Sequence, residues 1–396
     1  MKNQKRKKII YISYDGILDP IGESQILSYL EKLCKDFDFY LITFEKKNKL
    51  KTNVHREIKA RVKQSDIKWF NLRYHKQPPI LSTLYNVFRG TIITFFILFF
   101  NKISIVHVRS YIPGLITLPI NKIFDFKLIF DMRGLWVDEK LDRAGWRKKD
   151  LKYIFFKNIE KKLLLISDSI ICLTQESIKI LIDKFPEIKR KNIYKTFTCS
   201  NDQIFKPLHN KRINQSIVLG HLGSVDTAYN IEIIFQFLNI LLKIDQNIKL
   251  IIFNEDKHDY LFELKKKYQI NDKNIEVKFV NRYQLNTEIN KIDICIFFAK
   301  INFSIKASFP TKISEVLSAG KPIICNNFND EILKLFSKHK VGIIHDFDFS
   351  KNQSIIYYEI NNLISDENII LRCRNVAKKE LSFSQSIKLY KNIYYN

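Results

Sequence analysis

The chain has 396 residues, of which 46% are apolar, and a formal net charge of +25 from 66 basic and 41 acidic side chains. This apolar content excludes a globally disordered chain, and the length favours two domains of ordinary size over a single core. The charge indicates either an anionic partner or a neutral surface filled with lysine, and composition leaves both interpretations open.

The six cysteines are far apart in the sequence and none of them belongs to a CxxC pair. This spacing favours buried thiols over a zinc site or a redox motif, so we expect no metal. The basic start, MKNQKRKK, leads into a short apolar run that meets Asp15. We therefore predict a first β-strand rather than a signal peptide, and a cytoplasmic protein.

The N-terminal half alternates strand-like runs with amphipathic segments. Helices are predicted near residues 23–37 and 148–167, among others. Strands are predicted at residues 7–14, 39–45, 103–110, 127–134 and 169–174. Strands that alternate with helices are typical of a parallel, doubly wound α/β sheet.

The apolar run TIITFFILFF, residues 91–100, is the nearest approach to a membrane-spanning segment. It falls short of the roughly 18 apolar residues that a spanning helix needs, so no spanning helix is expected. Basic residues stand on either side of it, at Lys76, Arg89 and Lys102. Two interpretations stay open for residues 81–102: a helix of the core, or a helix that dips into a membrane surface.

A polar stretch at residues 193–216 is predicted to be a linker, after which the alternation resumes. Further strands are predicted at residues 216–224, 249–255, 275–281, 292–299 and 322–326. We therefore expect two facing Rossmann-like domains, residues 1–200 and 210–383, with the last helix, about 384–396, packed back on the first. Ligands of such sheets bind at the carboxyl ends of the strands, so the cleft between the domains is the expected site.

The stretch KASFPTKISEVLSAGKPII, residues 306–324, carries the strongest local signal. Ile313, Val316 and Leu317 recur with helical spacing, Thr311 is expected to cap the start of this helix, and Gly320 to follow its end. The helix begins where a strand has ended, so its free N–H groups face the carboxyl edge of a sheet. Such a helix start is an anion site.

Polar side chains at this helix start extend the anion site. Lys312 adds charge, and Ser308 and Thr311 add hydroxyls. Glu315 lies one turn further on, where a carboxylate can hold a ribose through two hydroxyls. The alternative is that Glu315 only pairs with Lys312 at i, i+3.

Six segments, in this order, resemble the GT-B glycosyltransferases of the family 4 type, and more narrowly the bacterial enzymes of surface polysaccharide synthesis such as capsule or lipopolysaccharide. The similarity runs from about residue 7 to 395. The segments are YISYDGILDPIGESQ, IVHVRSYIP, FDMRGLWVDE, GHLGS, FSIKASFPTKISEVLSAGKP and LRCRNVAKKELSFSQSIKLYKNIY.

The resemblance implies a donor site. Glu315 matches the second Glu of the family's Glu-x7-Glu motif, which grips the nucleotide ribose. The positions expected near the donor phosphates are Ser308, Thr311 and Lys312, together with Gly223 of the GHLGS segment and the loop that holds Gly16 and Gly22.

The resemblance also implies an N-terminal segment that faces the sugar. It holds Asp131, Arg133 and Asp138, which we take with Lys312 as the catalytic candidates. His107, Arg109 and Lys306 are candidate substrate contacts. Purely structural roles stay open as alternatives to catalysis and substrate binding. They are a structural role for His107, an ion pair of Arg133 with Asp131 or Asp138, a packing role for Trp136, and a helix start at Asp138 and Glu139.

Two positions depart from the family pattern. Ala307 stands where the first Glu of the motif is expected, so the donor sugar must be handled differently, with Lys306 or Ser304 in its place. The Arg and Lys pair expected after the first strand of the second domain is missing. The pyrophosphate would then depend more on Lys312, on backbone N–H groups and on Arg133.

The resemblance implies transfer of a sugar from a nucleotide-sugar to a hydroxyl, by a hexosyltransferase-like enzyme that is metal-independent and retains configuration. If the enzyme inverts, Asp131 or Asp138 would be the base. The expected acceptor is a lipid-linked saccharide at the inner membrane face. The rivals are another GT-B enzyme such as a sugar-nucleotide epimerase, an inactive partner subunit, and a basic nucleic-acid binder, for which no recognition motif is found.

Overall fold

The computed structural model describes residues 6–208, 216–225, 228–254, 258–346 and 353–396. The chain divides into two compact units. Unit 1 comprises Met1–Phe197 and Ser386–Asn396, and unit 2 comprises Thr198–Gln385. The last eleven residues therefore belong to the unit formed by the N-terminal half.

Unit 1 is built on a seven-stranded sheet with the order β3-β2-β1-β4-β5-β6-β7, in which every registered pair is parallel. Its strands are β1 (Lys7–Ser13), β2 (Phe37–Glu45), β3 (Lys68–Arg73), β4 (Ile105–Arg109), β5 (Lys127–Asp131), β6 (Ser169–Cys172) and β7 (Asn192–Lys195). The central strands are continuous apolar runs because helices cover both faces of the sheet.

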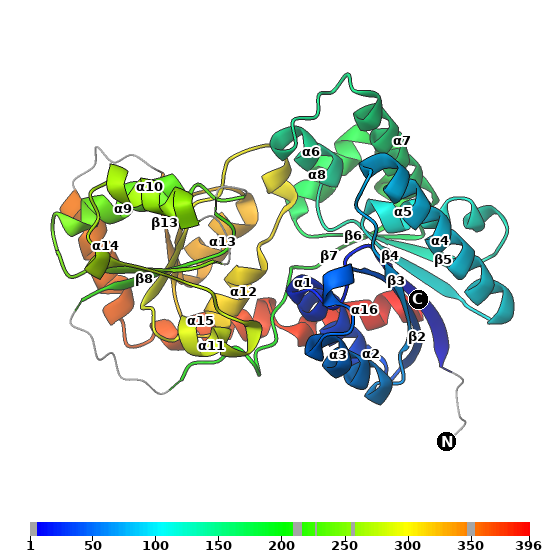
Figure 1. The fold of residues 1–396 in the computed structure, drawn as a ribbon, viewed down its shortest axis with the longest axis horizontal. Coiled ribbons are helices and arrows are strands. Elements are labelled where there is room, and N and C mark those ends of the chain that lie inside the picture. The colour runs from blue at the N-terminus through cyan, green and yellow to red at the C-terminus, as the bar shows by residue number, and fades with distance from the viewer. Residues whose placement is uncertain (1–5, 209–215, 226–227, 255–257, 347–352) are drawn as a thin grey trace. The chain divides into compact units, whose positions relative to one another are not determined.

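The helices of unit 1 form two layers (Figure 1). One layer holds α2 (Ser28–Leu33), α3 (Asn53–Gln64) and α16 (Phe383–Tyr395). The other holds α4 (Pro79–Phe100), α5 (Tyr111–Thr117), α7 (Leu151–Ile166) and α8 (Gln175–Lys184). Two shorter helices, α1 (Pro20–Gly22) and α6 (Trp136–Arg143), lie in loops beyond strand ends.

Unit 2 repeats the pattern with a six-stranded parallel sheet of order β10-β9-β8-β11-β12-β13. Its strands are β8 (Val218–Leu222), β9 (Lys249–Phe253), β10 (Ile275–Lys278), β11 (Ile294–Phe297), β12 (Ile323–Cys325) and β13 (Gly342–Ile344). Its helices are α9 (Ile231–Leu242), α10 (His258–Lys267), α11 (Arg282–Ile289), α12 (Thr311–Ser318), α13 (Asp330–His339), α14 (Gln353–Ser365) and α15 (Ile369–Glu380).

Both sheets have one point at which the strand order reverses. In unit 1 it lies between β1 and β4, whose last residues, Ser13 and Arg109, are paired neighbours. In unit 2 it lies between β8 and β11. Loops leave these two strands in opposite directions, so each carboxyl edge opens there into a natural ligand site.

The predicted α/β class with two Rossmann-like domains is confirmed. The sequence missed the strands β3, β7 and β13, which are partly exposed strands at sheet edges. The linker prediction is wrong at its start, because residues 192–195 pair with β6 as an edge strand. Residues 209–215 of that predicted linker lie outside the described part of the chain.

The apolar run near residue 91 is part of a longer helix than predicted. The helix α4 has 22 residues and a mean hydropathy of 1.5 over its most apolar 18-residue window. By length and composition alone it is long enough to cross a membrane, which corrects the expectation that no segment reaches that length. Of that window, 28% is buried within the protein.

Candidate active site

Lys312 lies at the strand-order reversal in unit 2, beside the carboxyl end of β8. Lys312 is the second residue of α12, and its Nζ lies 4.4 Å from the ring centre of Tyr229. The same Nζ rests against Gly223, the residue that follows β8. The start of α12 therefore lies within one lysine length of the carboxyl end of the first strand of the sheet.

Gly223 makes this contact possible. Its φ is +137°, a region that L side chains rarely adopt, and a Cβ at this position would lie 1.5 Å from Nζ of Lys312. A residue with a side chain would therefore displace the lysine. The sequence prediction of Gly223 as a phosphate-site residue is consistent with this geometry, which leaves the backbone bare beside the cation.

The electrostatics of this point favour an anion. Burial lowers the pKa of Lys312 to about 8, and no carboxylate of the described residues lies within salt-bridge distance of its Nζ. Burial, followed by the charge of Lys312, lowers the pKa of His221 on β8 to about 3, so this imidazole is neutral. The result is a partly buried ammonium group without a neutralising acid, which an anionic ligand would stabilise.

The start of α12 differs in detail from the prediction. Thr311 is the first helical residue and makes no capping hydrogen bond through its side chain, because Pro310 holds the cap position. The prediction of Thr311 as the cap is therefore wrong by one residue. Gly320 follows the end of the helix with φ +78°, as predicted. Without a side-chain cap, the N–H groups of Thr311 and Lys312 stay available to a ligand, whereas that of Ile313 donates to the carbonyl of Pro310.

Glu315 is buried one turn into α12, with 5% of its surface exposed. Its partner is Arg282, the first residue of α11, whose Nη1 lies 3.2 Å from Oε1. The alternative pairing with Lys312 is therefore wrong. Burial raises the pKa of Glu315, and the charge of Arg282 counteracts that rise. The arginine thus engages one of the two carboxylate oxygens of Glu315.

The turn before α12 explains the departure at Ala307. This residue is fully buried at the end of a short 3₁₀ turn (Ser304–Ala307), and Ser304 is buried as well. Lys306 between them is exposed. Of the two predicted replacements for the missing Glu, Lys306 is the one with an accessible side chain. Ser308 follows, and its carbonyl accepts a hydrogen bond from Asn329.

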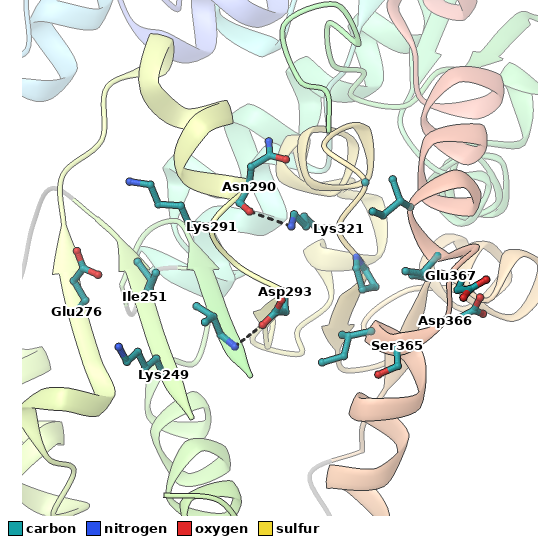
Figure 2. Close-up of a pocket in the computed structure, with 16 residues that line it drawn as sticks. Lys249, Ile251, Glu276, Asn290, Lys291, Asp293, Lys321, Ser365, Asp366 and Glu367 are labelled. Atoms are coloured by element: carbon teal, nitrogen blue, oxygen red, sulfur yellow. Dashed lines mark hydrogen bonds between the residues drawn. The ribbon is translucent and has the colours of Figure 1, made fainter. Parts of the chain in front are cut away.

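A cavity of about 530 Å³ lies at the opposite edge of the same sheet (Figure 2). Its walls include the first residues of two strands, Val218 and Lys249, and the residues that precede two others, Asp293 and Pro322. These are amino ends of parallel strands. Ligands of such sheets bind at the carboxyl ends, so this cavity is not the candidate donor site despite its size.

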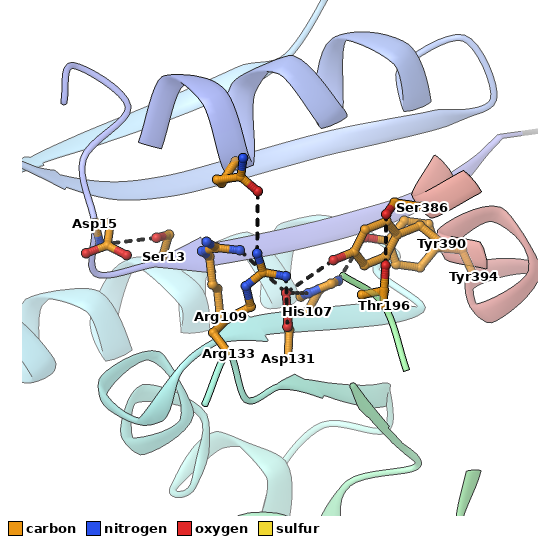
Figure 3. Close-up of polar contacts among 11 residues, drawn as sticks. Ser13, Asp15, His107, Arg109, Asp131, Arg133, Thr196, Ser386, Tyr390 and Tyr394 are labelled. Carbon is orange, nitrogen blue, oxygen red and sulfur yellow. Dashed lines mark hydrogen bonds and ion pairs between the residues drawn. The ribbon is translucent and has the colours of Figure 1, made fainter. Parts of the chain in front are cut away.

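The strand-order reversal in unit 1 holds a buried charge cluster centred on Asp131, the last residue of β5 (Figure 3). Arg109 at the end of β4 lies 3.7 Å from the carboxylate, and Arg133 lies 3.8 Å from its other oxygen. Tyr390 of α16 donates to the carboxylate at 3.3 Å. The predicted residues Arg109, Asp131 and Arg133 are therefore brought together by the fold.

Charge balance keeps this cluster ionised. Burial alone would raise the pKa of Asp131, but Arg133 and the neighbouring Arg109 and His107 hold it below its usual value. Arg133 adopts φ +56°, which turns its side chain back over the strand end toward Gln25, 3.5 Å away. The alternative for Arg133, an ion pair with Asp131, is borne out.

His107 lies inside β4 rather than at its end, and none of its surface is exposed. Its Nδ1 is 2.8 Å from the hydroxyl of Tyr394, and burial lowers its pKa, so the ring is neutral. The prediction of a direct substrate contact is wrong for this residue. His107 is a structural histidine that links β4 to α16.

Asp138 is not a free carboxylate. It lies in the first turn of α6 and forms a 2.7 Å ion pair with Lys157 of α7, which also binds Glu160. The helix-start alternative is therefore correct, and the catalytic prediction for Asp138 is not supported. Trp136 packs against the rings of Tyr111 and Phe156, as the packing interpretation expected.

Gly16 and Gly22 shape the loop after β1 by close approach. A Cβ on Gly22 would lie 1.9 Å from the carbonyl oxygen of Gly16, and one on Gly16 would lie 2.2 Å from Oε2 of Glu45. Glu45 in turn accepts hydrogen bonds from the backbone N–H groups of Ile17 and Leu18. The loop is thus folded onto a buried carboxylate, with its glycines at the contact points.

Residues 202–380 match the family described as "Glycosyl transferases group 1". The matched segment lies within unit 2 and contains Gly223, Lys312 and Glu315. Unit 2 thus contains a segment similar to the group 1 glycosyltransferases. The protein is accordingly a glycosyltransferase enzyme, and the predicted enzyme class is confirmed at this level.

Solved structures extend the likeness over the whole chain. Sucrose-phosphate synthase from Thermosynechococcus elongatus has a TM-score of 0.73 at 12% identity and covers 98% of this chain and 100% of its own. A glycosyltransferase from Rickettsia africae scores 0.72 at 14% identity, with 98% of both chains covered. Anabaena HepE, solved with UDP and glucose, scores 0.69 at 11% identity and covers 99% and 100%. At these identities the matches show the GT-B fold, as predicted.

No curated protein matches the sequence. The site residues of this glycosyltransferase therefore rest on its own geometry. Three of them escaped the sequence predictions as site residues: Arg282, Glu45 and Tyr394. Each reaches the site from an element far away in sequence, so no local motif marks it. A hint existed only for Tyr394, because the terminal segment had been expected to return to the N-terminal half.

Proposed function

We propose that this glycosyltransferase, of the family 4 type, moves a sugar from a nucleoside-diphosphate sugar to a hydroxyl of a lipid-linked saccharide in the synthesis of a cell-surface polysaccharide. The single observation that carries the donor class is the half-buried Lys312 against Gly223 at the start of α12, with the buried Glu315 one turn on. A cation, free N–H groups and a carboxylate in this order match a diphosphate joined to a ribose.

The donor would bind to unit 2 from the start of α12 inward. The diphosphate would contact Lys312 and the first N–H groups of the helix, and the ribose hydroxyls would reach the free oxygen of Glu315. The exposed Lys306 would face the sugar. The Anabaena protein that shares the fold was solved with UDP and glucose, which supports a nucleoside diphosphate here and makes UDP the first nucleotide to test.

The chemical step breaks the bond between the anomeric carbon and the phosphate oxygen. Its electron pair goes to the departing diphosphate, whose growing charge Lys312 and the helix start would stabilise. The acceptor hydroxyl forms the new bond on the same face and gives its proton to the leaving phosphate oxygen. Retention is supported by the state of Asp131 and Asp138, since both considered bases are buried in ion pairs.

In unit 1, the carboxyl edge of the sheet is a second candidate contact surface. Arg133 and Arg109 carry charge at this edge, while Asp131 holds both of them in place. Buried polar atoms without a hydrogen-bond partner among the described residues include Nε of Arg109 and Oδ1 of Asp131. We assign Arg133 and Arg109, the less buried members of this cluster, to contacts with the sugar or the acceptor.

The proposed location is the inner face of the plasma membrane, where the protein would be cytoplasmic and peripheral. The net charge of +25 and the long apolar helix α4 support it, because lipid-linked acceptors lie at an anionic surface. No metal is assigned to the reaction.

Calorimetric titration with UDP, GDP, ADP and CMP tests the donor site. We expect one nucleoside diphosphate to bind selectively, and Lys312→Met and Glu315→Gln to weaken it by about 10- to 100-fold, since each removes a charge-assisted hydrogen bond. Lys321→Met is the matched control. Lys321 is another lysine of unit 2 whose pKa burial lowers, but it lines the cavity at the amino edge. Equal binding by Lys312→Met, or loss of binding only in Lys321→Met, would refute the assignment.

A further inference from the structure

The helix α4 has its polarity reversed relative to an ordinary surface helix. Four of its buried side chains recur at every fourth position and are small or polar: Ser82, Asn86, Gly90 and Thr94. Nine of its large apolar side chains point away from the protein and are between 38% and 74% exposed: Ile80, Leu81, Leu84, Tyr85, Phe88, Ile92, Phe96, Phe99 and Phe100. Ile97 and Leu98, near the C-terminal end of the helix, are buried. A helix of a soluble domain normally shows the opposite arrangement.

The inward face of α4 is fixed to unit 1 by specific contacts. Asn86 donates to the hydroxyl of Tyr14 at 2.8 Å and to the carbonyl of His75 at 2.9 Å. Gly90 packs so closely against α5 that a Cβ on it would lie 2.6 Å from the side chain of Ile116. The polar stripe is therefore used for packing, and the apolar face is the outer surface of the folded unit.

Basic residues dominate the segment that carries this face. Residues 67–125 contain seven Lys and Arg side chains, of which Arg109 is buried beside Asp131, and one acidic residue, the exposed Asp125. Lys76 precedes the helix, Lys102 follows it, and Lys122 stands beside Ile123, which is 65% exposed. The ring of Phe124 lies 5.3 Å from that of Phe95 on α4. The loop that holds Ile123 and Phe124 therefore extends the apolar face at the C-terminal end of α4.

We propose that the outward face of α4, with Ile123, docks on a lipid bilayer that carries anionic headgroups. This inference rests on the proposed function in one respect only, namely that a lipid-linked acceptor gives the docking its purpose. The helix is about 33 Å long and would lie along the surface, with its apolar side chains among the acyl chains. The flanking lysines would meet the headgroups.

The helix lies on the membrane and does not cross it. Crossing would expose Asn86, Thr94 and the stripe between them to hydrocarbon, after loss of the hydrogen bonds to Tyr14 and His75. A flat orientation keeps all of these contacts and places only the exposed apolar side chains in lipid. The distinction follows from which side of the helix the protein already occupies.

A second copy of the chain fits this face less well than a bilayer does. Arg89 stands next to the midpoint of α4, so a two-fold pairing of antiparallel helices would bring Arg89 against the Arg89 of the other copy. The segment 67–125 holds one acidic residue, Asp125, against seven basic ones. Anionic headgroups supply the missing negative charge.

Vesicle flotation of the full chain tests the proposal. We expect binding to phosphatidylcholine vesicles that contain phosphatidylglycerol, and much weaker binding to pure phosphatidylcholine. The double variant Phe88→Ser with Phe96→Ser should lower the partition coefficient by at least about tenfold, since two aromatic side chains leave the lipid. The two side chains are 62% and 52% exposed, so the fold should tolerate the change.

The matched control is Phe262→Ser with Tyr358→Ser in unit 2, where the two rings are 54% and 65% exposed. It should bind vesicles like the wild type. No vesicle binding by the wild type, or equal losses in both double variants, would overturn the proposal. Loss of a dimer rather than of vesicle binding in the α4 variant would identify a second copy as the occupant instead. Nucleotide titration of the same proteins separates the two proposals, because the donor site can fail while vesicle binding stands.

Discussion

The two sheets reverse their strand order in the same way but present opposite electrostatics at that point. In unit 1 the edge holds Arg109 and Arg133 around the buried Asp131, whose carboxylate partly neutralises their positive charge. In unit 2 the edge holds Lys312, with a pKa lowered by burial and no acid at salt-bridge distance among the described residues. One edge is preorganised by its own ion pairs, while the other is left to be completed by an anion.

Topology sets where a ligand can bind, and the side chains at that point set which ligand it is. A buried charge that is paired stabilises its own unit, whereas a buried charge without a partner stores free energy that a ligand of opposite charge can release. The edge of unit 2 should therefore dominate anion binding, and the edge of unit 1 should dominate stability. Four experiments test this contrast.

The largest expected effect is on the stability of unit 1. Asp131→Asn leaves Arg109 and Arg133 buried without their acid, and should lower the free energy of unfolding of this unit by about 3–5 kcal/mol. All tryptophans, Trp69, Trp136 and Trp146, lie in unit 1, so their fluorescence during urea unfolding reports on this unit. The exposed Asp125→Asn should change stability by no more than about 0.5 kcal/mol. Equal stability of both variants would contradict the ion-pair assignment.

The next largest effect concerns the contact between Gly223 and Lys312. Gly223→Ala forces a Cβ into the place of Nζ and should weaken nucleotide binding by about 10- to 100-fold, through loss of the charged contact. Gly145→Ala is the control, because Gly145 also has a positive φ, +66°, but a Cβ there meets nothing within 4 Å. Calorimetric titration measures the nucleotide affinity of both variants. An unchanged affinity in Gly223→Ala would exclude Lys312 as the anion contact.

A pH profile should distinguish the two edges further. Lys312 has a pKa of about 8 in the free protein, and a bound diphosphate would favour its charged form and raise that value. Affinity for the nucleotide should therefore be constant below about pH 8 and fall by up to about tenfold per pH unit above it. Lys312→Met should abolish this slope. A wild-type affinity that stays flat up to about pH 9.5 would rule out titration of this lysine on binding.

The smallest expected effect belongs to Arg282. Burial raises the pKa of Glu315 and Arg282 counteracts the rise, so Arg282→Ala should raise that pKa further. Nucleotide binding by this variant should then weaken by a few-fold between about pH 8 and pH 6, relative to the wild type at the same pH values. Arg282→Lys should restore the wild-type profile. A parallel loss at both pH values would point to a merely structural role for Arg282.

Much of the fold and part of the site followed from sequence patterns. Apolar runs of strand length and the helical spacing of Ile313, Val316 and Leu317 marked the alternation of the two units and the helix α12. The edge strands β3, β7 and β13 escaped because partly exposed strands carry mixed side chains. The predictions for Asp138 and His107 were wrong because the sequence does not show their partners. Asp138 forms an ion pair with Lys157, and His107 forms a hydrogen bond with Tyr394.

Two apolar helices show the limit of hydrophobic patterns most clearly. α9 buries Ile234, Phe235 and Leu238 in the core of unit 2, as its composition predicts. α4 has a similar composition but buries Asn86 and Thr94 and exposes its aromatic rings. Periodicity reveals that a helix has two faces, yet only the packing against Ile116 and Tyr14 decides which face is inside.

Sequence patterns predicted the α/β class, the division into two similar halves, and the helix that begins beside Lys312. These features depend on residues close in the chain, whose spacing is visible in the sequence. Long-range packing set the partner of Glu315, the burial of His107, the contact of Lys312 with Gly223 and the outward face of α4. Those depend on residues far apart in sequence, whose meeting is set by the strand order and by the competition of all side chains for one core.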